Sequence, residues 1–209
     1  MGRYIVAITG ASGVAYARRL VGVLTRGGHH VDLLITAAGF QVLAHETEWA
    51  SMERHAPGGK GLAARCRTFF QPEDAQGEVV FHPLHDLADD LASGSVGMKA
   101  MIVIPCTMGR VSSFATGRSV DLLDRAADVA LKEGRPLVVV PREAPFSLIH
   151  LRNLTALAEA GAIILPASPG FYHNPRSVED LVDFIVAKVL DRLGIAQDLV
   201  ASWDRLKGG

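Results

Sequence analysis

Short apolar runs alternate with longer amphipathic segments along this chain. The runs are rich in Val, Ile and Leu, and they lie at residues 4–9, 31–36, 101–105, 136–141 and 162–166. Such runs are typical of strands buried on both faces of a parallel sheet. Between them, apolar positions recur at helical spacing, most clearly at residues 120–132, 148–160 and 178–193. The alternation predicts a doubly wound, Rossmann-like α/β fold with a parallel sheet between two layers of helices.

One stretch departs from this pattern. Residues 51–78 are rich in Gly, Pro and charged side chains, which predicts a loop or flap. The stretch is too short to be a domain of its own. The chain has 209 residues, of which 49% are hydrophobic, and can bury one good core. We therefore expect residues 1–209 to form a single α/β domain.

Charge and cysteine content restrict the partners and the compartment. The chain has 21 basic and 22 acidic residues and no block of like charge, so we expect neither nucleic acid nor a membrane as a partner. No apolar run reaches the ~18 residues that a membrane span requires. Cys66 and Cys106 are far apart in sequence, which favours a cytoplasmic location over a disulfide framework. Cys106 follows an apolar run directly, and we expect it to pack in the core.

Small, hydroxyl and charged residues follow each predicted strand. The segments after the five runs read GASG, TAAG, CTMGRVSS, REAPF and ASPGFYHNPRS. Ligands of doubly wound sheets bind outside the carboxyl ends of the strands, near the point where the strand order reverses. The sequence therefore places a candidate site at this edge of the sheet.

The GASG segment has two interpretations. A turn bounded by Gly10 and Gly13 and leading into a helix offers backbone N–H groups, and Ser12 offers a hydroxyl, to a phosphate or a flavin. Alternatively, Ser12 is only a helix N-cap and the glycines relieve crowding in a tight turn. The GASG segment alone does not decide between these two interpretations. It is not the full G-x-G-x-x-G motif of dinucleotide-binding proteins. In addition, Asp32 lies at the start of the second run, whereas a ribose-binding acid belongs at its end.

Charged side chains follow the fourth run and line one predicted helix. Arg142 suits a phosphate and Glu143 suits proton transfer. The alternative is a local ion pair that shapes a turn, but the position at a strand end favours a functional role. Arg125 and Lys132 share one helical face, which by spacing alone is a solvated face.

The histidines do not predict a metal site. His82 and His85 flank a proline and have no third ligand at a recognisable spacing. We expect His150 and His173 to serve in hydrogen bonds or subunit contacts.

Several longer segments together resemble the UbiX-type flavin prenyltransferases, within the homo-oligomeric flavin-containing decarboxylase-like proteins. The segments are TGASG near the start, ETE at 46–48, ASGS at 92–95, PCTMGRVSSFATG at 105–117, the run at 125–153 and the run at 161–195. Only residues 50–85 or so lie outside the resemblance. It implies that reduced FMN receives a dimethylallyl group from dimethylallyl phosphate, forming a ring through the flavin N5 and C6. It further implies that the prenylated FMN serves a UbiD-type decarboxylase, that the chain forms a homo-oligomer of twelve, and that no metal is required.

The resemblance also assigns residues by position. Those at FMN-binding positions are Gly10, Ala11, Ser12, Thr36, Thr107, Met108, Gly109, Arg110 and Arg142. Those at positions for the prenyl phosphate are Arg125, Lys132, Arg142, Tyr172 and Lys188. Those implicated in the chemistry are Glu143, Glu46 and Ser12.

The chain departs from the family pattern at a few of these positions. Leu87 stands where a tryptophan is frequent, Lys188 stands where arginine is usual, and Met108 and Arg110 alter the expected wall of the flavin site. Two alternative functions are an inactive flavin-binding paralogue and an FMN-dependent cysteine decarboxylase of related fold. The decarboxylases resemble one another through a PASANT loop, and this chain has PCTMG at that position.

Overall fold

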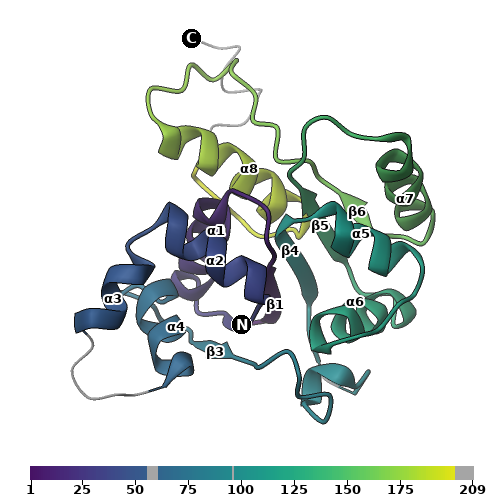
Figure 1. Cartoon of the computed structure of the whole chain (residues 1–209). Helices are drawn as coiled ribbons and strands as arrows, with labels where there is room; N and C mark the ends of the chain where they lie inside the picture. Colours follow the sequence, from purple (N-terminus) through teal and green to yellow (C-terminus); the bar gives the residue numbers. More distant parts are fainter. Residues whose placement is uncertain (56–60, 96, 201–209) are drawn as a thin grey trace.

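The computed structural model describes residues 1–55, 61–95 and 97–200 and shows a sheet enclosed by helices (Figure 1). Its described strands are β1 (Arg3–Ile8), β2 (His30–Ile35), β3 (Val79–Phe81), β4 (Ala100–Cys106), β5 (Leu137–Pro141) and β6 (Ile163–Ile164). They form one sheet in the order β3-β2-β1-β4-β5-β6, and every neighbouring pair is parallel. This order confirms the predicted doubly wound α/β fold.

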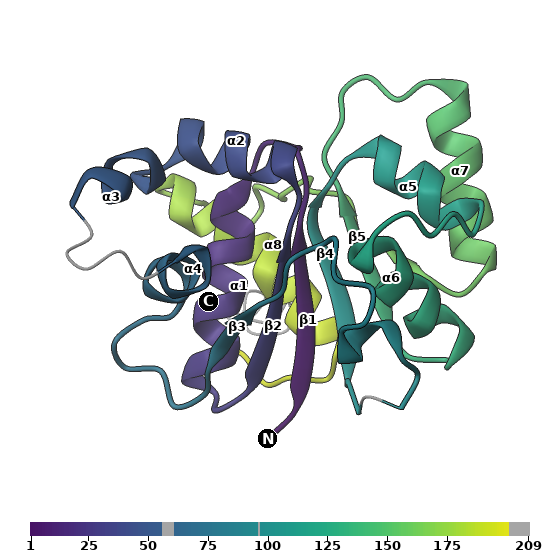
Figure 2. The ribbon, with the colours of Figure 1, turned by 60° about the horizontal axis from the view of Figure 1, so that its bottom comes forward.

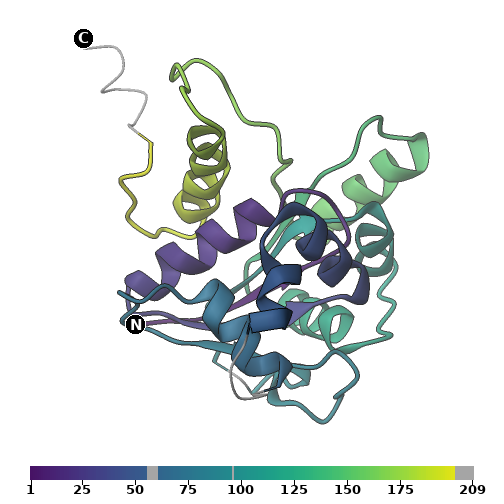
Figure 3. The ribbon, with the colours of Figure 1, turned by 60° about the vertical axis from the view of Figure 1, so that its left-hand side comes forward.

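Helices cover both faces of the sheet (Figure 2). One face carries α1 (Val14–Arg26), α4 (Leu62–Phe70) and α8 (Val178–Arg192), and α8 packs beside α1 (Figure 3). The other face carries α5 (Met108–Ala115), α6 (Leu122–Lys132) and α7 (Leu148–Glu159). The remaining described helices are α2 (Ala37–Glu46), α3 (Trp49–His55) and the short 3₁₀ helix η1 (Asp90–Ala92). None of the helices in the described ranges is both long enough and apolar enough to cross a bilayer.

Each central strand contributes to two hydrophobic cores because its side chains alternate between the faces of the sheet. In β1, Val6 and Ile8 pack in the core that contains α1 and α8. Ile5 and Ala7 pack in the core that contains α5 and α6. Burial on both faces explains why the strands appear as continuous apolar runs in the sequence.

The segment at residues 51–78 differs from its prediction. It contains the end of α3 and all of α4, while residues 56–60 lie outside the described residues. Cys66, Phe69 and Phe70 are buried in the core beside α1. Their spacing is that of one helical face, and the surrounding Gly and charged residues conceal it in the sequence. The prediction of a loop or flap is therefore wrong for residues 62–70, which form a helix.

Candidate active site

The predicted site lies at the carboxyl edge of the sheet, around the point where the strand order reverses. The chain leaves β1 towards β2 on one side, whereas β4 pairs with β1 on the other side. The loops after β1, β2, β4 and β5 carry the Gly10–Gly13 turn, Thr36, Thr107 and the Arg142–Glu143 pair. The fold thus brings together, at one edge, four groups that are far apart in the sequence.

Two threonines begin helices at this edge. Thr36 is the N-cap of α2, and its hydroxyl accepts a hydrogen bond from the Gly39 N–H at 2.9 Å. Thr107 is the N-cap of α5, and its hydroxyl accepts from the Arg110 N–H at 3.4 Å. A capped helix start presents further backbone N–H groups and a positive dipole end, which together favour an anion. The edge therefore has donors suited to a phosphate.

The start of α1 already has an anionic partner. The Glu46 carboxylate accepts hydrogen bonds from the Gly13 N–H at 3.0 Å and from the Val14 N–H at 2.9 Å. Gly13 is the N-cap and has a left-handed φ of 115°, which glycine adopts without strain. Ser12 is exposed. The interpretation of Ser12 as the N-cap is therefore wrong, because Gly13 is the N-cap.

Gly10 provides close packing between the first two loops. A Cβ at this position would lie 2.6 Å from the Cβ of Ala38 in α2. A larger residue at position 10 would push α2 away from the turn. The crowding interpretation thus holds for Gly10.

Arg142 and Glu143 are exposed and do not form an ion pair with each other in the described part of the chain. The Arg142 backbone N–H donates to the Cys106 carbonyl at 3.2 Å, which fixes the β5 loop beside the end of β4. The Glu143 carboxylate accepts from the Ala144 N–H at 3.1 Å. The local ion-pair interpretation is therefore wrong, and both charged groups remain available at the edge.

Met108 and Arg110 have side chains engaged within the protein. Met108 is buried in the core beside α6. The Arg110 guanidinium pairs with Asp121 at 2.6 Å and also with Asp124. Burial opposes the charge of Arg110, but the hydrogen bonds that its guanidinium donates to the two carboxylates raise its pKa above the usual value. The alteration of the flavin-site wall by these side chains, like their contact with FMN, stays a prediction.

The predicted prenyl-phosphate residues do not all meet in one chain. Lys132 ends α6, shortly before β5 begins, so it lies towards the opposite edge of the sheet from Arg142. Its ammonium pairs with Glu133 at 3.1 Å. On the same helix, Arg125 donates to the Ala92 carbonyl at 3.1 Å and pairs with Asp128 at 2.6 Å.

Tyr172 and Lys188 are linked by an aromatic side chain on the other face of the sheet. The Tyr172 ring lies 5.6 Å from the ring of Phe184 in α8, and the Lys188 ammonium lies 5.6 Å from the centre of the same ring. Tyr172 is 52% exposed. Both residues thus lie near the Phe184 ring, whereas Lys132 and Arg125 lie in the opposite helix layer.

Several remaining predictions concern histidine and cysteine. His150 Nδ1 accepts a hydrogen bond from the Ser147 N–H, as expected of a structural histidine. His173 stacks on Phe184, and neither ring nitrogen has a hydrogen-bond partner among the described residues.

Cys106 is fully buried, and burial raises the pKa of its thiol well above the usual value, so it is a core residue. His, Cys, Asp and Glu side chains in the described ranges form no group that would hold a metal ion.

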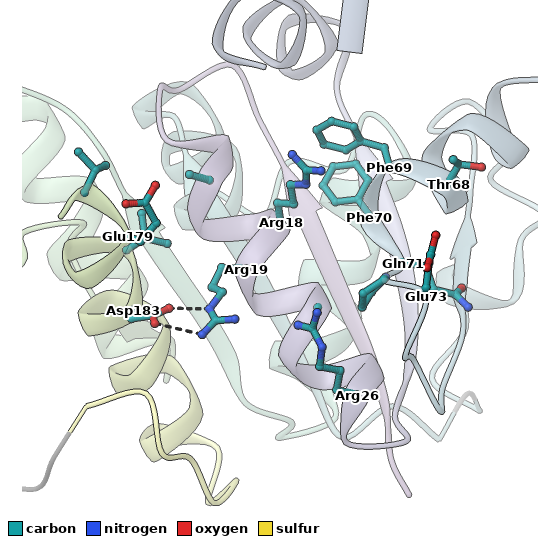
Figure 4. A pocket seen from close by; sticks show the side chains of 15 residues that line it. Arg18, Arg19, Arg26, Thr68, Phe69, Phe70, Gln71, Glu73, Glu179 and Asp183 are labelled. Carbon is teal, nitrogen blue, oxygen red and sulfur yellow. Dashed lines mark hydrogen bonds and ion pairs between the residues drawn. The ribbon is translucent and has the colours of Figure 1, made fainter. Parts of the chain in front are cut away.

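One groove lies away from this edge. It has a volume of about 770 Å³ and lies between α1, α4 and α8 (Figure 4). Its arginines already have partners: Arg19 pairs with Asp183, Arg18 with Glu48 and Arg26 with Asp74. Because these charges are neutralised within the chain, the groove is a poor site for an anionic substrate.

Comparison with known proteins agrees with the resemblance that the sequence motifs indicate. The flavoprotein family profile matches residues 2–190. The flavin prenyltransferase UbiX of Pseudomonas aeruginosa is 47% identical over 201 residues, covering 96% of this chain and 93% of that protein.

Solved structures extend the similarity to the fold. A UbiX (AnUbiX) in complex with FMN and dimethylallyl pyrophosphate is 33% identical, with a TM-score of 0.83 over 97% of each chain. A dodecameric FMN-dependent UbiX-like decarboxylase from Escherichia coli O157:H7 is 34% identical, with a TM-score of 0.80 over 96% of this chain and 98% of that one. A peptidyl-cysteine decarboxylase is 13% identical over 92% of this chain and 98% of that one, with a TM-score of 0.56, and this shows a shared fold alone.

Proposed function

The chain belongs to the flavoprotein family and, within it, to the flavin prenyltransferases, and we propose that it transfers a dimethylallyl group from dimethylallyl phosphate to reduced FMN. The new ring joins the flavin N5 and C6, and the prenylated FMN passes to a UbiD-type decarboxylase. The observation that carries the proposal is the meeting of Arg142, Glu143 and two capped helix starts at one sheet edge. A similar protein has been solved with FMN and dimethylallyl pyrophosphate.

The residues at this edge fit FMN. Thr36 and Thr107 hold hydroxyls beside the N–H groups of α2 and α5, which suit the FMN phosphate. Gly109 lies in the first turn of α5, and a Cβ there would meet no atom within 4 Å. A flat ring system can therefore approach the backbone at this position. When bound, reduced FMN supplies the nucleophilic N5 and C6.

Arg142 is the cation suited to the leaving phosphate. Its guanidinium is exposed at the strand end, where it can donate two parallel hydrogen bonds to phosphate oxygens. The negative charge on these oxygens grows as the allylic bond breaks, so a fixed cation stabilises the transition state more than the bound substrate. Tyr172 and Lys188 provide a second donor and a second cation for the same phosphate.

Glu143 is the general base of the proposed reaction. Transfer to N5 breaks the allylic C–O bond, and the released phosphate takes up the N5 proton. Ring closure then joins C6 to the substituted carbon of the prenyl double bond. The other alkene carbon gains the proton from the phosphate, and the Glu143 carboxylate accepts the proton that C6 loses. One of its oxygens is held by the Ala144 N–H. That bond orients the carboxylate towards the loop edge, while the other oxygen remains to take the proton.

The active protein is a homo-oligomer of twelve chains in this proposal. Lys132 and Arg125 lie away from Arg142 in one chain, so their contact with the phosphate requires a neighbouring copy. A similar solved protein is dodecameric. We place the protein in the cytoplasm, and its two cysteines, which are both unpaired and buried, are compatible with a reducing compartment.

The test is anaerobic incubation of the purified protein with reduced FMN and dimethylallyl phosphate, followed by mass spectrometry of the extracted flavin. We expect a mass gain of one dimethylallyl unit. Unchanged FMN that remains bound to the protein, with both dimethylallyl phosphate and pyrophosphate as donors, would contradict the proposal and favour a flavin-binding paralogue.

The Glu143→Gln substitution tests the base. We expect this variant to bind FMN with the affinity of the wild type and to lose prenylation by about a hundredfold or more, because the amide cannot accept the proton. Glu159→Gln, at an exposed acid near the end of α7, is the matched control and should react normally. Wild-type rates in Glu143→Gln would exclude Glu143 as the base.

A further inference from the structure

Thr9 joins the two loops that flank the point of strand-order reversal. It follows β1 directly, and its side chain is buried. Its hydroxyl donates to the Pro105 carbonyl at 2.8 Å and accepts from the Thr107 N–H at 2.8 Å. The Thr9 backbone N–H also donates to the Pro105 carbonyl, at 3.3 Å. The hydroxyl therefore donates one hydrogen bond and accepts another, both to the end of β4 and the residue that follows it.

The link lies beyond the paired part of β1 and β4. The residue pairing of β1 with β4 runs from Tyr4 with Ala100 to Ala7 with Val103. After their last residues, β1 and β4 lead into α1 and α5, which pack on opposite faces of the sheet. The Thr9 hydroxyl continues the connection at the place where the regular pairing has ended.

We propose that Thr9 is a positioning residue, which sets the distance between the Gly10–Gly13 turn and the start of α5. It acts through Thr107, whose N–H it holds and whose own hydroxyl caps α5. This inference rests on the proposed function, since the two loops are the walls between which FMN is placed. Thr9 itself is covered by protein and does not touch the flavin.

Replacing the hydroxyl by a methyl group isolates this role. Thr9→Val keeps the shape of the side chain but leaves the Thr107 N–H without its acceptor, so the start of α5 must move or recruit water. We expect the Kd for FMN to rise about tenfold. Thr9→Ser keeps the hydroxyl and should restore affinity to within about twofold of the wild type.

Thr25 offers a matched control. It is also fully buried, and its hydroxyl donates to the Val21 carbonyl at 2.8 Å within the last turns of α1, towards the opposite edge of the sheet. Thr25→Val removes a buried threonine hydroxyl without touching the two loops. We expect it to change thermal stability but not the Kd for FMN.

The experiment titrates FMN into all four proteins and follows quenching of flavin fluorescence, with thermal unfolding measured in parallel. A Kd in Thr9→Val within about twofold of the wild type would overturn the inference, as would a Thr9→Ser variant as weak as Thr9→Val. If Thr9→Val does not fold, Thr9→Ala is judged by the same criterion. A wild-type protein that binds FMN but does not prenylate it would refute the proposed function alone, and one that binds no FMN would refute both.

Discussion

At the scale of single residues, Glu46 has a structural role that can be separated from a chemical one. Its carboxylate holds the Gly13 and Val14 N–H groups at the start of α1. Gly13, the N-cap residue, has no side chain that could accept these bonds. The resemblance to prenyltransferases also implicates Glu46 in the chemistry, so its two roles need different substitutions.

We expect Glu46→Ala to lower the free energy of unfolding by about 1 kcal/mol, because the start of α1 loses its cap. Glu46→Gln keeps an oxygen acceptor and removes only the charge, so its free energy of unfolding should be about 0.5 kcal/mol lower than that of the wild type. Urea denaturation measures both. Glu48→Ala is the control: Glu48 forms an exposed pair with Arg18 and should matter little.

The same variants report on chemistry. If Glu46 acts only as a cap, Glu46→Gln will prenylate FMN at close to the wild-type rate. A Glu46→Gln protein that is stable, binds FMN and does not turn over would show a direct chemical role.

At the scale of elements, a buried carboxylate joins three strands. Asp32 in β2 is fully buried and accepts two hydrogen bonds from the Arg3 guanidinium of β1, at 2.6 and 3.0 Å. His82, just after β3, contacts Asp32 at 2.9 Å and Asp89 at 2.6 Å. His30 lies 3.0 Å from Asp32. The short edge strand β3 is thus fixed to the sheet by charge as well as by its backbone.

This network makes stability depend on pH in a defined direction. Burial disfavours the Asp32 anion, but hydrogen bonds from His82, Arg3 and His30 hold its pKa well below the usual value. Burial likewise disfavours charged His82, but its bonds to Asp32 and Asp89 raise its pKa. The Asp32 contribution is present above its unfolded pKa of about 4, and it is lost as the pH falls through the folded value. The His82 contribution is complete below about pH 6.5 and is lost as the pH rises through the folded pKa of His82.

We therefore expect the urea concentration at the unfolding midpoint of the wild type to decrease as the pH rises from 6 to 9. His82→Asn should lower the free energy of unfolding by about 2 kcal/mol at pH 6. In this variant the urea midpoint should also decrease much less between pH 6 and pH 9. His85→Asn, at an exposed position, is the control. An unchanged pH dependence in His82→Asn would show that another group is responsible.

At the scale of the whole molecule, α7 leaves much of its apolar surface uncovered. Leu148, Ile149 and Leu151 are 61%, 67% and 47% exposed, and Leu157 is its only buried residue in the described structure. A helix that is apolar on several sides is typically covered by other protein. The proposed assembly of twelve chains would supply that cover next to the loop that carries Arg142 and Glu143.

We expect Ile149→Asp to convert the assembly into smaller species, because a charge at the centre of an apolar interface is desolvated without a partner. Light scattering measures the mass. Ala158→Asp, exposed near the other end of α7, is the comparison. A monomeric wild type would contradict the proposed assembly, and an intact dodecamer in Ile149→Asp would place the interface elsewhere.

The sequence by itself was sufficient for the central strands and for the edge at which the site lies. The runs at 4–9, 31–36, 101–105 and 136–141 correspond to β1, β2, β4 and β5. Burial on both faces leaves a local apolar signal. Parallel strands place their carboxyl ends at one edge, so the segments after these runs had to meet.

Only the tertiary structure decided the contacts within that site. Thr9 lies 96 residues from Pro105, and Glu46 lies 33 residues from Gly13, so no local pattern records either bond. The pairing of Arg110 with Asp121 and Asp124, and the location of Lys132 at the far edge, likewise depend on how helices pack against the sheet. A periodic pattern specifies which face of an element is buried. The partner of each polar group on that face is fixed only when distant segments pack together, because hydrogen bonds depend on the position of both atoms.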